Sequence, residues 1–204
     1  MKQLLCRDLK PGDILLKMAT TSFTHKLITF AQNYAGQPNA FLGHAAVALD
    51  TQFCIEAQAA GISGNHLAMK NKDCGYIVYR PKSAELGQGA ATAAKLLFDI
   101  HQKQGNLSYG AKGAVKSIFG PPGTAKSADE MEALLDKILA GKGQPFFCSQ
   151  FVVYVYQWAA RQSGIPAEEV FDVSDAKASP SVLASKLVGN PCFAEAGYMM
   201  PNER

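Results

Sequence analysis

Charged residues are scarce in this sequence and account for 18% of it, against the ~25% that is usual in globular proteins. No run of five like charges occurs, which excludes the basic or acidic tails typical of nucleic-acid partners. Twenty basic and 17 acidic residues give a net charge of only +3. Apolar residues make up 48%, enough to build a core, so a disordered chain is excluded as well.

Long hydrophobic runs are also missing. The most apolar segment, residues 145–160, is shorter than the ~20 residues of a membrane span and contains Ser149, Gln150 and Gln157. The first residues offer only Leu4-Leu5-Cys6 as an apolar patch, whereas a signal peptide needs ~7–15 apolar residues. We therefore expect no stable membrane insertion and synthesis in the cytoplasm, with any role outside it depending on a separate export machine.

Cysteines are few, odd in number and widely spaced, and neither a CxxC pair nor an HExxH motif is present. A disulfide framework is not expected at this length and spacing, and at least one thiol must be free. No zinc-ligand spacing occurs, so we expect no metal and no cofactor. The five cysteines are Cys6, Cys54, Cys74, Cys148 and Cys192.

Hydrophobic periodicity predicts strands in the first half of the chain and helices in most of the second, without internal repeats. This order favours an α+β layout, an antiparallel sheet packed against helices, in one domain over residues 1–204. Strands are expected over 13–18, 44–49, 53–57, 76–80 and 192–199, and helices over 20–32, 90–104, 131–140, 148–162 and 180–187.

Cys148 is the first candidate for chemistry. It follows a loop and begins an apolar predicted helix with the sequence Cys-Ser-Gln-Phe. Unpaired amides and the dipole at a helix N-terminus favour an anion and lower the pKa of a thiol. The alternative is that Cys148 is a small core residue, as many free cysteines are.

A nucleophilic thiol needs a base, and the sequence has four histidines. His25 and His101 fall on predicted helices beside lysines, which favours solvated positions, and His66 falls in a polar loop. His44 differs because it begins a strand among Gly43 and alanines. We therefore take His44 as the candidate base, with a buried structural histidine as the alternative.

Glu56 is the candidate third residue, because it is an acid in the otherwise apolar strand Phe-Cys-Ile-Glu-Ala. A hairpin turn centred near Thr51 would pair position 46 with 56 and position 44 with 58. Glu56 would then share the face of His44, one step along, where a carboxylate could orient the imidazole. The alternative is a surface acid on an edge strand.

Five short motifs together resemble the permuted papain-like NlpC-type cysteine peptidases and amidases, including the YiiX-like group. In this family the order along the chain is His, acid, Cys, the reverse of papain, and the resemblance covers roughly residues 11–185. The motifs are Gly12-Asp13-Ile-Leu-Leu, Gly43-His44-Ala-Ala-Val-Ala, Ile55-Glu56-Ala with a later Gly61-Ile62, Cys148-Ser-Gln-Phe-Val, and Ser179-Pro180-Ser-x-Leu-Ala.

The resemblance implies a permuted papain-like cysteine hydrolase with Cys148 as nucleophile, His44 as base and Glu56 as the polar third residue. The backbone amide of Cys148 would be the candidate donor that stabilises the oxyanion of the reaction intermediate, and Tyr109 would be a weaker candidate. The implied substrate is bacterial cell-wall peptide. The resemblance permits a secreted antibacterial effector, delivered to the periplasm of a target cell and partnered by an immunity protein or a secretion-system carrier.

Two alternatives remain at this stage. Lecithin retinol acyltransferase-like members of the same family imply a lipid acyltransferase or phospholipase, for which the apolar segment 114–123 would supply an entry. A binding module with an inactive site is disfavoured, because all three residue types occur in the expected order.

Overall fold

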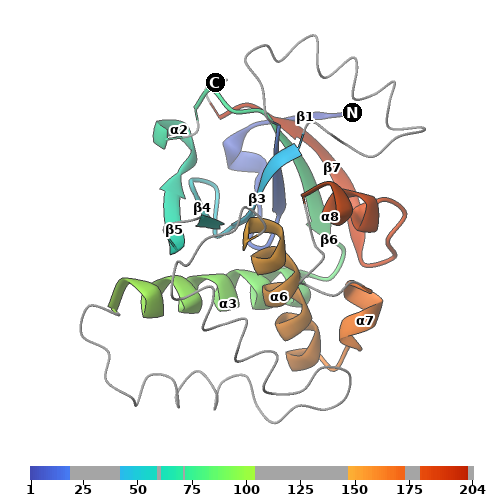
Figure 1. The fold of residues 1–204 in the computed structure, drawn as a ribbon. Coiled ribbons are helices and arrows are strands. Elements are labelled where there is room, and N and C mark those ends of the chain that lie inside the picture. The colour runs from blue at the N-terminus through green and yellow to red at the C-terminus, as the bar shows by residue number, and fades with distance from the viewer. Residues whose placement is uncertain (19–41, 59–60, 71, 104–146, 173–179, 202–204) are drawn as a thin grey trace.

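Seven strands form one sheet in the part of the chain that the computed structural model describes, residues 1–18, 42–58, 61–70, 72–103, 147–172 and 180–201. The strand order is β1-β7-β6-β2-β3-β4-β5 (Figure 1), and every neighbouring pair is antiparallel except β1 and β7. The strands are β1 Gln3–Leu4, β2 Ile14–Met18, β3 Leu42–Ala48, β4 Phe53–Gln58, β5 Gly61–His66, β6 Tyr76–Pro81 and β7 Phe193–Met199.

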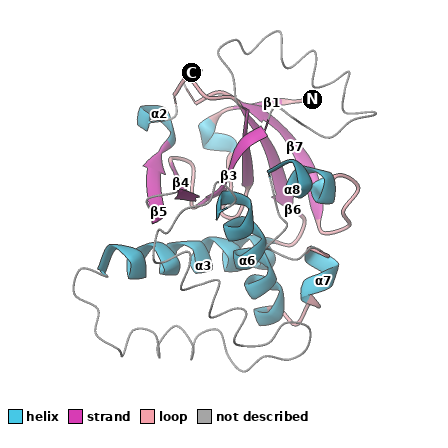
Figure 2. Cartoon of the chain, viewed as in Figure 1, coloured by secondary structure: helices cyan, strands magenta, loops and turns pink. Residues whose placement is uncertain are grey.

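Two long helices, α3 and α6, lie against one face of the sheet and contact each other (Figure 2). Helices and a mostly antiparallel sheet therefore share one core, and the predicted α+β class is confirmed. The helices are α2 Leu67–Lys70, α3 Ala84–Lys103, α6 Phe147–Gln162, α7 Ala167–Val170 and α8 Pro180–Leu187, with a short 3-10 helix at Cys6–Asp8.

The two faces of the sheet are both buried, and side chains alternate between them as the strand period requires. On β2, Ile14 and Leu16 join the large core under α3, α6 and α8, whereas Leu15 joins a smaller cluster on the other face. The segment before β2 covers that smaller cluster with Leu4 and Leu9. A strand buried on both sides reads as a continuous apolar run, and β2 has this pattern over residues 14–16.

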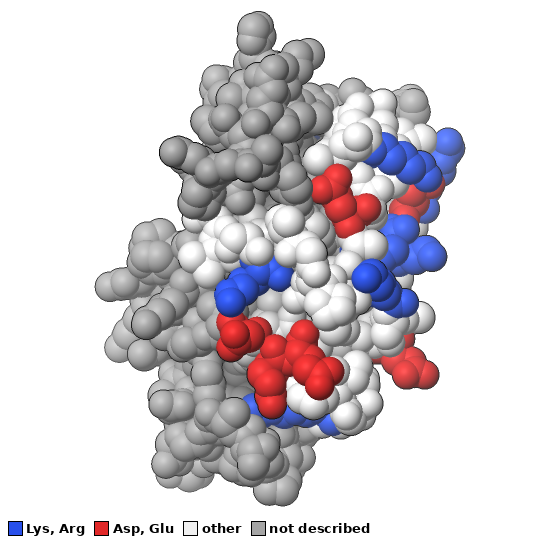
Figure 3. All heavy atoms as spheres, turned by 90° about the vertical axis from the view of Figure 1, so that its right-hand side faces the viewer, with Lys and Arg blue, Asp and Glu red and all other residues white. Residues whose placement is uncertain are grey.

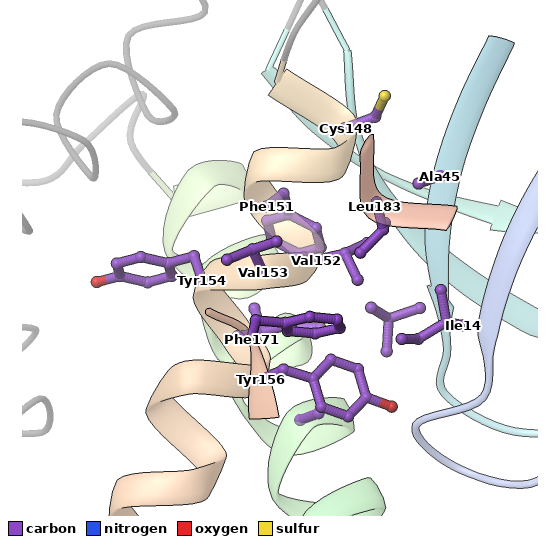
Figure 4. Packing of buried hydrophobic residues seen from close by; sticks show 14 of the residues in the cluster. Ile14, Ala45, Cys148, Phe151, Val152, Val153, Tyr154, Tyr156, Phe171 and Leu183 are labelled. Carbon is purple, nitrogen blue, oxygen red and sulfur yellow. The ribbon is translucent and has the colours of Figure 1, made fainter. Parts of the chain in front are cut away.

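Helix α6 is apolar on almost all sides because it runs through the core. Figure 4 shows its first turns packed with Ile14 of β2 and Leu183 of α8. Further along, the Tyr156 hydroxyl donates a hydrogen bond to the carbonyl oxygen of Gly12. The Tyr156 ring also packs edge-on against Phe171. These contacts fix the helix relative to the start of β2.

The start of β2 is held by a buried ion pair. Asp13 is fully buried, and Arg80 of β6 contacts both of its carboxylate oxygens, at 2.8 Å from Nε and 2.6 Å from Nη2. The Asp13 carboxylate also accepts the amide of Lys10 at 2.9 Å. A buried carboxylate is tolerated when it is paired and hydrogen-bonded in this way. The pair therefore ties the turn before β2 to the neighbouring strand.

The predicted hairpin between the second and third strands is present. Asp50 Oδ1 accepts the amides of Gln52 and Phe53, at 2.7 and 2.8 Å, which closes the turn. Val47 pairs with Ile55 and Ala48 pairs with Cys54. Extending this register by one residue sets position 46 opposite position 56, as the turn predicted.

Several sequence-based boundaries were wrong. Residues 61–66 form β5, although Gly, Ser and Asn suggested a loop, because pairing with β4 overrides their weak strand propensity. Helix α3 begins at Ala84, before the expected position 90, since Ser83 Oγ caps it by accepting the amide of Leu86. Strand β1 and helix α7 were not predicted.

Other expectations lie outside the described residues and stay predictions. They are the helices over 20–32 and 131–140.

Both signs of charge are interspersed on the described part of the face drawn in Figure 3, as the composition predicts. Among the helices that the structure describes, none combines the length and apolar character needed to cross a membrane.

Gly12 should be intolerant of a side chain. Its φ is +84°, and a Cβ there would overlap the backbone of Gly87 on α3. Gly164 is the matched control, since its φ is +69° but nothing lies within 4 Å of its Cβ position. We expect Gly164→Ala to lower the free energy of unfolding by about 1 kcal/mol, and Gly12→Ala by about 2 kcal/mol more, in urea titrations. Equal losses in the two variants would contradict the close approach of the β2 turn to α3.

Candidate active site

Cys148 lies in the first turn of α6, as predicted, and only 2% of the residue is exposed. Figure 4 shows it at the first turn of the helix, with its sulfur pointing away from the labelled core side chains. The nearby backbone amides of Ala45 and Ser149 help to lower the pKa of the thiol. One of these amides belongs to β3 and the other to the helix itself.

His44 lies near the start of β3, opposite Lys17 of β2. Its ring interacts with the thiol of Cys148 and lies 2.9 Å from the carboxylate of Glu56. The side chain is 21% exposed, so part of the ring can be reached from outside while the rest is shielded. Because the side chain is only half-buried, the alternative of a buried structural histidine does not fit its exposure.

Glu56 lies in the interior of the sheet, because β5 pairs with β4 along its whole length. Only 3% of its side chain is exposed. The alternative of a surface acid on an edge strand is therefore wrong. Glu56 Oε2 lies 2.9 Å from His44 Nε2, an ion-pair distance, and neither atom makes a well-aligned hydrogen bond within the described residues.

The three predicted residues thus meet where α6 reaches the sheet. The β3–β4 pairing explains how His44 and Glu56 come together, since residues 44, 46 and 56 share one face. The start of α6 supplies the thiol from the other layer. The structure brings all three groups together with the imidazole contacting both of the others.

Burial opposes the charged form of each of these groups, but their mutual contacts outweigh it. Burial lowers the pKa of His44, whereas hydrogen bonds to Cys148 and Glu56 raise it, with a net rise to about 9. Burial raises the pKa of Cys148, but the hydrogen bond and charge of His44 bring it below the ordinary thiol value. The arrangement favours a thiolate beside an imidazolium.

The pKa of Glu56 is lowered in the same way. Burial raises it, while the hydrogen bond and charge of His44 lower it more strongly, and Gln58 and Lys17 add to this effect. The carboxylate is therefore ionised when it faces the imidazolium.

Two amide side chains at Glu56 were missed from the sequence. Gln58 and Asn65 each donate a side-chain N–H to Glu56 Oε1. Asn65 is 4% exposed and lies on β5. Ser63 pairs with Glu56, and Asn65 lies two positions beyond Ser63 on the same strand. This spacing could have identified Asn65 from the sequence only if β5 had been recognised as a strand.

The other histidines do not join this group among the described residues. His66 ends β5 and packs edge-on against Phe53, so its placement in an exposed loop was wrong. His101 lies on α3 as predicted, but it is half-buried with its ring against Gly61, rather than fully solvated. His25 and the oxyanion candidate Tyr109 lie outside the described residues.

No group of three or more His, Cys, Asp or Glu side chains that could hold a metal ion is found within the described ranges. Comparison with protein-family models, curated proteins and solved structures finds no match for this chain.

A thiolate, an imidazole and a carboxylate in this order provide a nucleophile, a proton carrier and an orienting group. Cys54 shows the contrast, because burial and the nearby Glu56 charge raise its pKa far above that of an ordinary thiol. It therefore stays protonated and unreactive. Cys148 is the thiol with the environment of a nucleophile.

The pH dependence of Cys148 alkylation by iodoacetamide should show two steps. The rate rises first as Cys148 ionises, below the usual thiol pKa of about 8.5. It rises again near pH 9, where His44 loses its proton and the thiolate becomes more basic and more nucleophilic. Peptide mass spectrometry at each pH would follow Cys148, with the buried Cys54 as an unreactive internal control.

In His44→Ala the first step should move up to or above the ordinary thiol pKa and the second should disappear. A wild-type protein and a His44→Ala variant with the same profile would contradict the ion pair.

Proposed function

We propose that this chain is a thiol hydrolase of permuted papain-like fold, a cysteine amidase or endopeptidase that cleaves amide bonds of bacterial cell-wall peptide. The observation that carries the proposal is the imidazole of His44, which contacts the thiol of Cys148 on α6 and the carboxylate of Glu56 on β4. The order His, acid, Cys along the chain and the NlpC-like motifs support the fold and the substrate class.

In the proposed reaction the Cys148 thiolate attacks the carbonyl carbon of an amide and forms a C–S bond. Backbone N–H groups at the start of α6 stabilise the resulting oxyanion, and the amide of Cys148 is the candidate donor. As the C–N bond breaks, the His44 imidazolium gives its proton to the leaving amine. The product of this step is a thioester on Cys148.

Neutral His44 then takes a proton from water, which attacks the thioester. The C–S bond breaks, the acid product leaves, and Cys148 returns to a thiolate beside the protonated imidazole. Glu56 stabilises the charged ring and holds its orientation, and it takes no proton in either step.

Lipid acyl transfer remains the competing function. The same three groups could act on an ester, but the apolar segment that favoured a lipid lies at 114–123, outside the described residues. The described residues therefore add no specific support to it, and it serves as an outcome of the test below.

Defined cell-wall peptides should be cleaved by the wild-type protein, with products identified by mass spectrometry, while phospholipid vesicles stay intact. Cys148→Ala should lower the rate by at least ~10³-fold, because the covalent route is lost. Cys6→Ser, Cys74→Ser and Cys192→Ser are matched controls and should keep most activity, as should protein treated with a chelator. Cleavage of vesicles alone would favour the lipid function, and an active Cys148→Ala would refute the thiol mechanism.

Glu56→Gln should lower kcat by ~10–10³-fold with KM little changed, because it removes the charge that stabilises the imidazolium while keeping the size of the side chain. His44→Ala should cost more, since it removes the proton carrier itself. Steady-state rates on one wall peptide, with circular dichroism to verify folding, would measure both. A Glu56→Gln loss greater than that of His44→Ala would contradict an orienting role.

A further inference from the structure

The carboxylate of Glu56 is held asymmetrically. Its Oε1 accepts two side-chain amides, from Asn65 and Gln58, while its Oε2 lies 2.9 Å from His44 Nε2 and accepts no amide among the described residues. Carboxylates accept through both oxygens. With one oxygen occupied by amides, the other is left for the imidazole.

Sheet register explains where these donors come from. Glu56 pairs with Ser63 and Cys54 pairs with Asn65 across β4 and β5. Asn65 is thus the diagonal neighbour of Glu56 on the same face, a position from which side chains reach each other. Gln58 follows two positions after Glu56 on β4 and shares that face as well.

The two donors differ in their surroundings. Asn65 is buried at 4% exposure, whereas Gln58 is exposed at the end of β4. A hydrogen bond shielded from water is electrostatically stronger, and its loss cannot be repaired by solvent. Gln58 also lowers the pKa of Glu56, but because its bond is open to water we expect it to contribute less to the ionised state than Asn65 does.

We propose that Asn65 is a positioning residue of the site: its buried amide keeps Glu56 ionised and turns Oε2 toward His44, and this sustains the imidazolium beside the Cys148 thiolate. The inference rests on the proposed function, because the ion pair that it supports is the proposed nucleophile and proton carrier. In this proposal Asn65 acts through Glu56 and makes no contact with the substrate.

Other charged or titratable groups act on Glu56 from the elements around it. Lys17 of β2 adds positive charge and favours the carboxylate. Burial raises the pKa of Cys54 and also that of Tyr76 on β6, so both remain neutral. Since these two groups carry no charge, the cations His44 and Lys17 and the amide donors determine the state of Glu56.

The test measures alkylation of Cys148 by iodoacetamide near pH 6.5 (a value set roughly at the reference pKa of histidine), followed by mass spectrometry of the Cys148 peptide. This readout needs no substrate. Asn65→Leu removes the donor, and we expect the rate to fall about tenfold, as for a thiol pKa raised by about one unit. Asn65→Ala repeats the deletion without added bulk, in case the Leu variant fails to fold.

A double-mutant cycle separates positioning from general destabilisation. In a Glu56→Gln background, Asn65→Leu should lower the alkylation rate of Cys148 by no more than about threefold, because no carboxylate charge remains for Asn65 to stabilise. Ser63→Ala is the matched control: Ser63 Oγ lies 3.4 Å from the Asn65 amide nitrogen but does not hold Glu56, so the rate should be unchanged. Gln58→Leu should cost less than Asn65→Leu.

The inference would be overturned if Cys148 were alkylated at the wild-type rate in Asn65→Leu. It would also be overturned if Asn65→Leu lowered the rate equally in the wild-type and Glu56→Gln backgrounds. Either result would leave the proposed function standing. A wild-type Cys148 that shows no enhanced alkylation at this pH would overturn both, because no ion pair would exist to be sustained.

Discussion

Glu56 lies inside the sheet with 3% of its side chain exposed, and a carboxylate removed from water needs hydrogen bonds or an opposite charge. Each group around it supplies one of these. His44 offers a cation, and Asn65 and Gln58 offer amide donors. Burial alone would neutralise the acid, the imidazole and the thiol, and the charge on each group is stabilised by the charges of the others. Such groups titrate as a unit rather than as independent residues.

The unit spans two layers of the fold, and its geometry depends on how those layers are joined. His44 and Glu56 belong to the sheet, while Cys148 belongs to α6. The Tyr156 hydroxyl connects α6 to the Gly12 carbonyl at the start of β2. β2 also pairs with β3 along the residues around His44. The helix that carries the thiol and the strand that carries the base are therefore both held by β2. A shift of α6 would therefore move the thiol relative to the imidazole.

Local chemistry in the sequence predicted the parts of the site that depend on short-range rules. The turn at Asp50–Gln52 fixed the register that sets His44 and Glu56 on one face, and the start of an apolar helix identified Cys148. Asn65 could not be found in this way. Its strand contains Gly61, Ser63 and Gly64, which have little strand propensity, and it forms only because β4 offers a partner edge. The edge-strand alternative for Glu56 stayed open for the same reason, because β5 was not predicted.

The site also shows why the thiolate does not depend on one interaction. The nearby amides of Ala45 and Ser149 lower the pKa of the thiol, and the helix N-terminus favours negative charge there even without the imidazole. The imidazolium, in contrast, is stabilised by the thiolate and by Glu56. Loss of the carboxylate should therefore weaken the base more directly than the nucleophile. The buried amide of Asn65 is then coupled to the thiol only through two intermediates, the carboxylate and the ring, and its influence must diminish along that path.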